Sequence, residues 1–144
     1  MKQTSTLDDA ASRYALPAAR VSLFLIYAWF GALKVIGQSP ASPLVQDLQE
    51  KTLSFVDFDT FMVLFGLAEV GIGALFLWKG KEKLALIVML LHMATTLLPL
   101  ILLPGDVWQH PFVPTLEGQY IIKNLALISL ALCIVTLSRA AKPR

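Results

Sequence analysis

Charged residues are scarce in this sequence: Asp, Glu, Lys and Arg make up only 15% of its 144 residues, against about 25% in an average soluble domain. Such a chain has too few charges to coat the surface of a soluble protein. Its single cysteine, Cys133, excludes an intrachain disulfide, a CxxC redox pair and a thiolate metal cluster. A net charge of only +2 excludes a basic domain that binds nucleic acid.

Apolar residues are abundant instead, at 56% of the chain with a mean hydropathy of +0.67. A transmembrane helix needs about 20 mostly apolar residues, and four segments qualify, because their apolar runs are continuous and do not alternate as barrel strands do. The sequence therefore predicts an all-α fold, a transmembrane four-helix bundle in the lipid bilayer. The expected spans are 18–36, 61–78, 84–103 and 120–137, within a transmembrane domain 18–138 that follows a polar segment 1–17 and precedes a basic tail 139–144.

The linkers between the expected spans differ in character. Residues 79–83 (KGKEK) form a tight turn, so the second and third spans should make an antiparallel hairpin. Residues 38–60 open with SPASP, a helix stop, and continue with a stretch that could be a short amphipathic helix on the membrane surface. Residues 104–119 carry three prolines with Trp and Phe, which predicts an ordered interfacial loop. Pro17 is expected just before the first span, where a missing N–H costs nothing.

The positions of lysine and arginine near the span ends predict the orientation. Nine basic residues lie on one side of the bundle and one on the other. Both termini and the KGKEK turn should therefore be cytoplasmic, in the inner (cytoplasmic) membrane of the cell. The first span lacks a small-x-small exit, so a cleaved signal peptide is not expected. The nine residues are Lys2, Arg13, Arg20, Lys79, Lys81, Lys83, Arg139, Lys142 and Arg144, and the one on the other side is Lys51.

Ionisable side chains inside a span are costly and normally face the bundle interior or water. Glu69 lies 12 residues before Lys81, at the centre of the KGKEK turn, and His92 lies 11 residues after it. In an antiparallel hairpin both reach the same depth, near the middle of the bilayer, where they could share a proton or a hydrogen bond. We leave two interpretations open: the pair only pins two helices together, or it serves as a proton relay or ligand contact.

Two further lysines, Lys34 and Lys123, are expected near the outer ends of their spans. Either could snorkel to the headgroups or pair with an outer carboxylate such as Glu117 or Asp106. Alternatively, the two lysines could receive an anionic or quinone-like ligand beneath the proline- and aromatic-rich outer loop; Asn124 stands beside Lys123. Helical spacing predicts one inward face on each span, and Pro99 is expected to kink the third span. The four faces are Arg20, Phe24, Tyr27, Gly31, Lys34 and Gln38; Gly66, Glu69, Gly73 and Leu77; His92, Thr95, Thr96 and Pro99; and Glu117, Tyr120, Asn124 and Ala131.

Other constellations are absent from the sequence. It holds no Ser-His-Asp grouping, P-loop or dinucleotide fingerprint. His92 and His110 lie far apart and at different depths, so no metal site is expected. The Ala28-x-x-x-Ala32 pattern of small residues could pack within the bundle or support a homo-oligomer.

Three segments together resemble the DoxX-like family of small membrane proteins. RVSLFLIYAWFGALKVIG resembles the opening helix of that family, with its aromatic and Gly-x-x-Lys. GLAEVGIGALFL is similar to the second helix with Gly-x-x-Glu, and EGQYIIKNLALISLAL is similar to the last helix, although Asn124 stands where many relatives have Asp. The resemblance covers about residues 18–137. It implies a four-helix membrane bundle, and by residue it implies candidates at Lys34, Glu69, Glu117, Lys123 and Asn124.

The same resemblance implies a link to redox biology. Relatives include a membrane subunit of thiosulfate:quinone oxidoreductase and a partner in a membrane-bound thiol and superoxide defence complex. The leading hypothesis is therefore a subunit or anchor of a membrane redox complex, without a catalytic motif of its own, in which a bound quinone or an oxidoreductase partner carries the electrons. The alternatives are a small-solute or proton transporter or channel, and a purely structural bundle.

Overall fold

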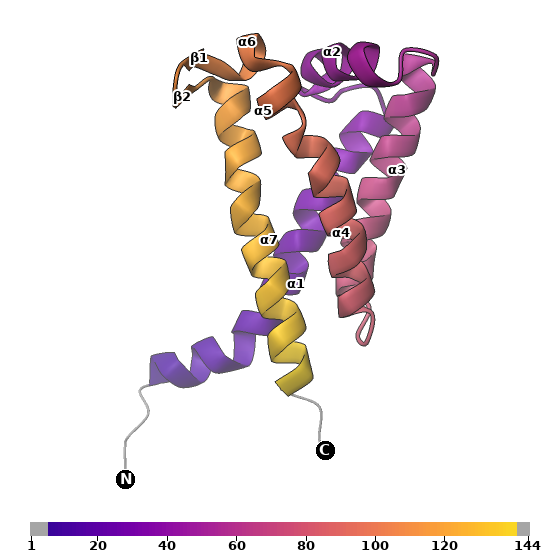
Figure 1. Cartoon of the computed structure of the whole chain (residues 1–144). Helices are drawn as coiled ribbons and strands as arrows, with labels where there is room; N and C mark the ends of the chain where they lie inside the picture. Colours follow the sequence, from indigo (N-terminus) through magenta and orange to yellow (C-terminus); the bar gives the residue numbers. More distant parts are fainter. Residues whose placement is uncertain (1–5, 141–144) are drawn as a thin grey trace.

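The computed structural model describes residues 6–140, in which four helices are long and apolar enough to cross a membrane (Figure 1). This confirms the predicted all-α transmembrane bundle. Three of the basic residues used for orientation, Lys2, Lys142 and Arg144, lie outside the described residues. The spanning helices are α1 (Thr6–Val35), α3 (Phe58–Leu77), α4 (Glu82–Leu97) continued by α5 (Pro99–Leu102), and α7 (Leu116–Ala140).

The two ends of the bundle are built differently (Figure 1). One end carries the start of α1, the end of α7 and the turn between α3 and α4, and we call it the terminal end. The other end is covered by α2 (Ser42–Thr52), by the short α6 (Pro104–Val107) and by a hairpin of β1 (Trp108–His110) and β2 (Val113–Pro114); we call it the cap end. The linker 38–60 thus contains the predicted short helix and the segment 104–119 is ordered as predicted, while their placement at a membrane surface remains a prediction.

The cap end is tied together by a few polar contacts. The Lys51 ammonium of α2 donates to the Leu102 carbonyl at 3.1 Å, and the Trp108 indole donates to the Leu100 carbonyl at 3.2 Å. In the antiparallel hairpin, Trp108 pairs with Pro114. These contacts hold α2 and the hairpin across the ends of the spanning helices.

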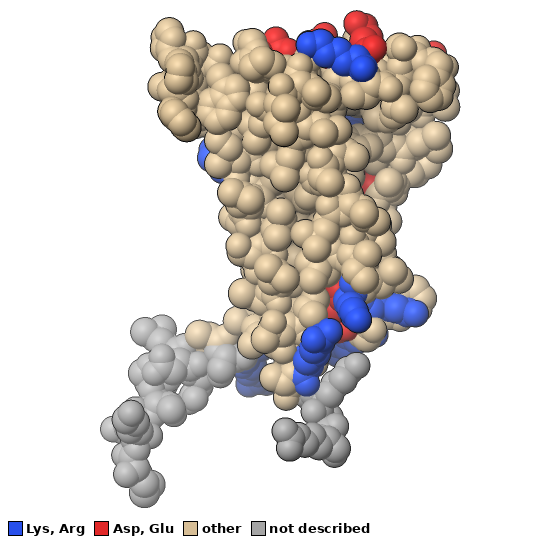
Figure 2. All heavy atoms as spheres, in the orientation of Figure 1, with Lys and Arg blue, Asp and Glu red and all other residues tan. Residues whose placement is uncertain are grey.

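Charge is concentrated at the two ends of the molecule (Figure 2). In that view Lys and Arg gather at the terminal end, acidic residues with a lysine lie on the cap end, and the belt between them is almost uncharged. An apolar belt bounded by polar ends is the pattern of a membrane-spanning bundle. The cytoplasmic placement of the terminal end remains a prediction.

The first helix begins earlier than the sequence predicted. The described part of the expected polar segment 1–17 is helical, because α1 begins at Thr6, and Pro17 lies inside this helix. Proline removes an intrahelical hydrogen bond and its ring clashes with the preceding turn, which bends a helix. Figure 1 shows the indigo part of α1 running sideways from the rest of the helix. The first span is therefore entered through a bent helix, and Pro17 lies within α1 instead of just before its first turn.

Two other helix ends have clear local causes. Helix α1 ends at Val35 because Gly37 adopts a φ of +70°, with its N–H donating to the Lys34 carbonyl and the Gln38 N–H donating to the Leu33 carbonyl. This is a Schellman motif, for which glycine is the favoured residue. Helix α4 ends at Leu97 and a new turn begins at Pro99, which confirms the predicted break in the third span.

The N-terminus of α3 is capped by Asp57, whose carboxylate accepts a hydrogen bond from the Thr60 N–H at 2.9 Å. This bond lowers the pKa of Asp57 below its ordinary value of 3.8. A lowered folded-state pKa means that the cap stabilises the fold at neutral pH and is lost as the pH falls below 3.8 and through the folded pKa. We expect Asp57→Ala to lower the melting temperature in detergent at pH 7, and this loss should shrink as the pH falls below 3.8. Asp57→Asn can still accept the Thr60 N–H but carries no charge, so it should cost less than Asp57→Ala at pH 7 and should remove this pH dependence.

Candidate functional site

The site is built on a close crossing of α1 and α3. A Cβ atom placed on Gly31 would lie 2.5 Å from the Gly66 carbonyl oxygen, and one placed on Gly66 would lie 2.5 Å from the Gly31 carbonyl oxygen. No real Cβ fits at that distance, so only glycine permits this approach. The two segments, GALKV at 31–35 and GLAEV at 66–70, are locally alike, and the antiparallel crossing relates them as a pseudo-two-fold pair. The charged residue of each segment lies one turn beyond its glycine.

This crossing determines the depth of Lys34. Lys34 faces Gly66, and Gly66 lies eight residues inside α3, roughly 12 Å along the helix from its first residue. Helix α1 therefore stops well below the cap end of α3. Lys34 is only 7% exposed, so the prediction that it snorkels to the headgroups is wrong.

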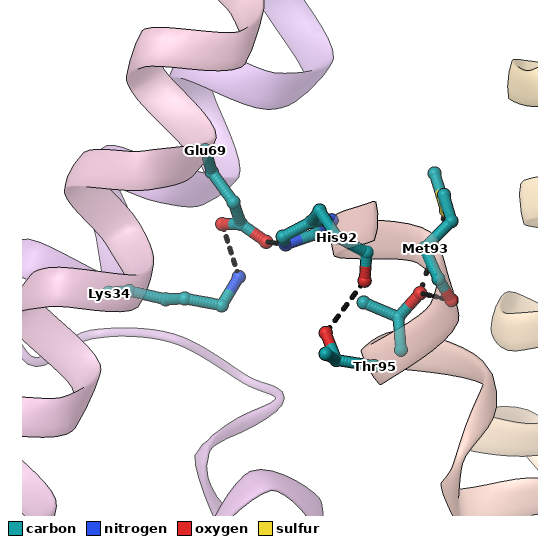
Figure 3. A network of polar contacts seen from close by, with 6 residues as sticks. Lys34, Glu69, His92, Met93 and Thr95 are labelled. Atoms are coloured by element: carbon teal, nitrogen blue, oxygen red, sulfur yellow. Dashed lines mark hydrogen bonds and ion pairs between the residues drawn. The ribbon is translucent and has the colours of Figure 1, made fainter. Parts of the chain in front are cut away.

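Three ionisable side chains from three helices meet beside this crossing (Figure 3). The Lys34 Nζ atom donates to Glu69 Oε2 at 2.6 Å, and His92 Nε2 lies 3.1 Å from Glu69 Oε1. We call Lys34, Glu69 and His92 the trio. The structure thus brings Glu69 and His92 together, as the counting from the turn predicted, and adds Lys34 from α1 in place of the expected pairing with an outer carboxylate.

Aromatic rings enclose the trio. The Phe65 ring stacks on the His92 ring at 4.9 Å, and the Lys34 ammonium lies 5.6 Å from the centre of the Phe65 ring. On the other side, Tyr27 packs its ring against His92 at 5.6 Å in an edge-to-face arrangement. Such surroundings strengthen the Lys34–Glu69 attraction because water is kept away. Burying an ion pair does not in itself stabilise a fold, so the trio is a candidate for function.

Several polar atoms of this region have no hydrogen-bond partner within residues 6–140. They are the Tyr27 hydroxyl and both ring nitrogens of His92. His92 Nε2 is at ion-pair distance from Glu69, but the direction of its N–H does not meet hydrogen-bond geometry. His92 Nδ1 has neither a hydrogen bond nor an ion-pair contact among the described residues. Buried polar groups without partners are rare and call for an explanation.

The candidates on α7 lie away from the trio. Glu117 and Lys123 are exposed, Asn124 is half-buried, and none of the three makes a hydrogen bond or ion pair with Lys34, Glu69 or His92. Lys123 instead lies 5.0 Å from the centre of the exposed Tyr120 ring. The Thr95 hydroxyl donates a hydrogen bond to the His92 carbonyl within α4 at 2.6 Å, so its hydrogen is not directed into the site.

Sequence reasoning missed a second buried ionic network, at the terminal end. Arg20 of α1 pairs with Glu82 of α4, donates to the Ser138 hydroxyl of α7 at 2.8 Å, and donates to the Phe76 carbonyl at the end of α3 at 2.8 Å. We call Arg20, Glu82 and Ser138 the clamp; together with the Phe76 carbonyl of α3, they join all four spanning helices. Glu82 also accepts the Gly80 N–H at 2.9 Å. An acidic residue inside an otherwise basic turn was the signal that could have found it.

Within residues 6–140, no group of three or more His, Cys, Asp and Glu side chains could hold a metal ion. An open hollow of about 530 Å³ lies on the cap end, between α2 and α6. It is lined by Asp47, Glu50, Lys51, Leu103 and Asp106. The hollow lies at the polar surface, apart from the trio.

A model of the DoxX-like family matches residues 24–132, well over half of the chain. The matched segment contains all three residues of the trio and both glycines of the crossing. It confirms the resemblance seen in the sequence motifs. No curated protein and no solved structure matches the chain.

Proposed function

The chain belongs to the DoxX-like family, and on that premise we propose that it is the membrane subunit or anchor of a quinone- or thiol-linked redox complex, with the trio as its site. It is a multi-pass membrane protein, and we place it in the inner membrane with an oxidoreductase as partner. The observation that carries the proposal is the buried contact between Glu69 and His92, whose free Nδ1 atom is a proton acceptor without a protein partner.

The trio has the parts needed to accept a proton inside the bilayer. Lys34 pairs with Glu69 at 2.6 Å and compensates its negative charge inside the bundle. Glu69 lies beside the Nε2 side of His92, so Nδ1 would accept a proton from a ligand hydroxyl and the carboxylate would stabilise the resulting imidazolium. Glu69 therefore orients the base and stabilises its protonated form, and His92 is the group that would touch a ligand.

A lipid-soluble quinone fits this donor set, because its reduced form carries hydroxyls whose protons must leave when its electrons do. The quinone supplies the two-electron chemistry when bound. Cys133 is the sole cysteine and cannot make a dithiol within the chain, so the electrons pass to the partner protein. The role of this chain is to hold the ligand and to take up one of its two protons, while the second proton passes with the electrons to the partner protein.

We expect His92→Ala to lower quinol-dependent turnover of the purified complex about 100-fold, the usual size of a lost general base. Glu69→Gln should also lower it, because the amide cannot stabilise the imidazolium. The complex is to be isolated in mild detergent with the chain as bait, its quinone extracted and its partners identified. His110→Ala and Glu50→Gln, at exposed positions, are the matched controls. The proposal fails if neither a quinone nor an oxidoreductase is recovered with the wild type.

The two lysines give a second comparison. Lys34→Met removes the neutralising charge of Glu69 and should abolish quinone recovery, whereas Lys123→Met removes an exposed charge and should leave it intact. Equal effects of the two substitutions would mean that Lys123 also contributes to the site, and would contradict its exposed position away from the trio.

Proton transport is a second candidate function, favoured by the same Glu69–His92 contact near the middle of the bundle. It predicts proton flux in proteoliposomes that is lost in Glu69→Gln and His92→Ala. Flux that both variants leave unchanged would rule it out. A bundle with no function beyond structure predicts that these substitutions change thermal stability alone.

A further inference from the structure

Tyr27 carries a polar group that the fold itself does not use. The residue is 4% exposed, and its hydroxyl has no hydrogen-bond partner within residues 6–140. A hydroxyl buried away from water costs free energy when it is left unpaired, and hydrocarbon offers no partner. Phenylalanine would keep the ring packing in the core and avoid this cost. The hydroxyl therefore needs an explanation outside the packing of the bundle.

The position of Tyr27 connects it to the trio. It lies on α1 on the same helical face as Gly31 and Lys34, and its Cβ atom packs where Gly73 of α3 leaves room. Its ring meets the edge of the His92 ring, while Phe65 stacks on that ring at 4.9 Å. His92 is thus packed between two aromatic residues, with its Nε2 atom 3.1 Å from Glu69 Oε1. The Tyr27 hydroxyl and both His92 ring nitrogens have no hydrogen-bond partner within residues 6–140, and of the two nitrogens Nδ1 is the one that also makes no ion-pair contact.

We propose that Tyr27 is a ligand-binding residue of this site. Its hydroxyl donates a hydrogen bond to one oxygen of the ligand, and His92 Nδ1 accepts a hydrogen bond from a hydroxyl of the same ligand. The ligand class is a lipid-soluble ring compound that bears both a hydrogen-bond acceptor and a donor oxygen. This inference rests on the proposed function and adds to it a residue outside the ion-paired trio. A donor and an acceptor that are both satisfied only by the ligand make binding specific, because an apolar lipid chain leaves both unpaired.

The test is Tyr27→Phe in the full-length protein, which removes one oxygen atom and keeps the ring. The probe is decylubiquinone, reduced to its quinol, and its Kd is measured in detergent micelles together with the melting temperature. We expect about 10-fold weaker binding, the equivalent of one lost hydrogen bond. The melting temperature should be unchanged or higher, because a buried unpaired hydroxyl is removed. Tyr14→Phe and Tyr120→Phe, at exposed positions, should bind as the wild type does.

A second readout separates this inference from the proposed function. The ring ¹⁵N signals of His92 should shift when the quinol probe binds, and in Tyr27→Phe the same shift should require about 10-fold more probe. If the wild type binds the probe and shifts His92 while Tyr27→Phe binds equally well, Tyr27 has no such role and the proposed function stands. If Tyr27→Phe melts well below the wild type, its hydroxyl serves the fold and the inference is wrong. If the wild type shows no binding and no shift, both proposals fall.

Discussion

Replacing Glu82 with methionine is expected to lower the free energy of unfolding by about 3 kcal/mol, as removal of one partner from a buried ion pair does. The substitution leaves the Arg20 guanidinium charged and buried at the terminal end, where it keeps only the Phe76 carbonyl and the Ser138 hydroxyl as acceptors. It also removes the acceptor of the Gly80 N–H. Equilibrium unfolding in mixed micelles measures the loss. Lys83→Met, an exposed position on the same turn, should stay within about 0.5 kcal/mol of the wild type.

The pair Arg20 and Glu82 also gives a double-mutant test of the clamp. Because the cost of the single change is mainly an uncompensated charge, Arg20→Met combined with Glu82→Met should be less destabilised than Glu82→Met alone. Additive losses would show that the two side chains do not act together, and would contradict the clamp.

Replacing Gly66 with alanine is expected to cost about 2 kcal/mol, in the range for overpacking a close contact. The new Cβ would lie 2.5 Å from the Gly31 carbonyl and 2.9 Å from the Lys34 Cβ. Neither neighbour is the free end of a flexible side chain, so α1 and α3 must separate. Gly31→Ala should behave alike, because it meets Gly66 and Glu69 in the same way. The separation also pulls Lys34 from Glu69, so both variants should lose ligand binding at the trio.

Gly71 provides the matched control for this prediction. It lies on the same helix as Gly66, and a Cβ added there meets nothing within 4 Å. Gly71→Ala should therefore raise stability by about 0.5 kcal/mol, through the lower conformational freedom of alanine in the unfolded chain. Equal effects of Gly66→Ala and Gly71→Ala, measured by unfolding in mixed micelles, would contradict the close crossing.

The apolar runs of the sequence determine the four spanning helices. In lipid every backbone polar group must find its partner within the protein, and a continuous apolar segment of this length can do so only as a helix. The short turn at 79–83 then sets α3 and α4 side by side in opposite directions. This is why counting outward from Lys81 was enough to predict the contact between Glu69 and His92. Pro99 likewise determines a local break, because proline cannot continue the hydrogen-bond ladder.

Only the tertiary structure decided which of the remaining polar residues share a site. Counting along α1 places Lys34 near the membrane surface, but the glycine crossing sets the register of α1 against α3, and that register buries Lys34 against Glu69. The same packing turns Lys123 outward and joins Arg20 to Glu82, 62 residues apart. The physical reason is that a helix period fixes which residues share a face, whereas the depth and rotation of each helix depend on its contacts with the others. The scarcity of charged residues therefore predicted a membrane protein, and the packing of four helices brought two of them, Lys34 and Glu69, together with His92 in the candidate site.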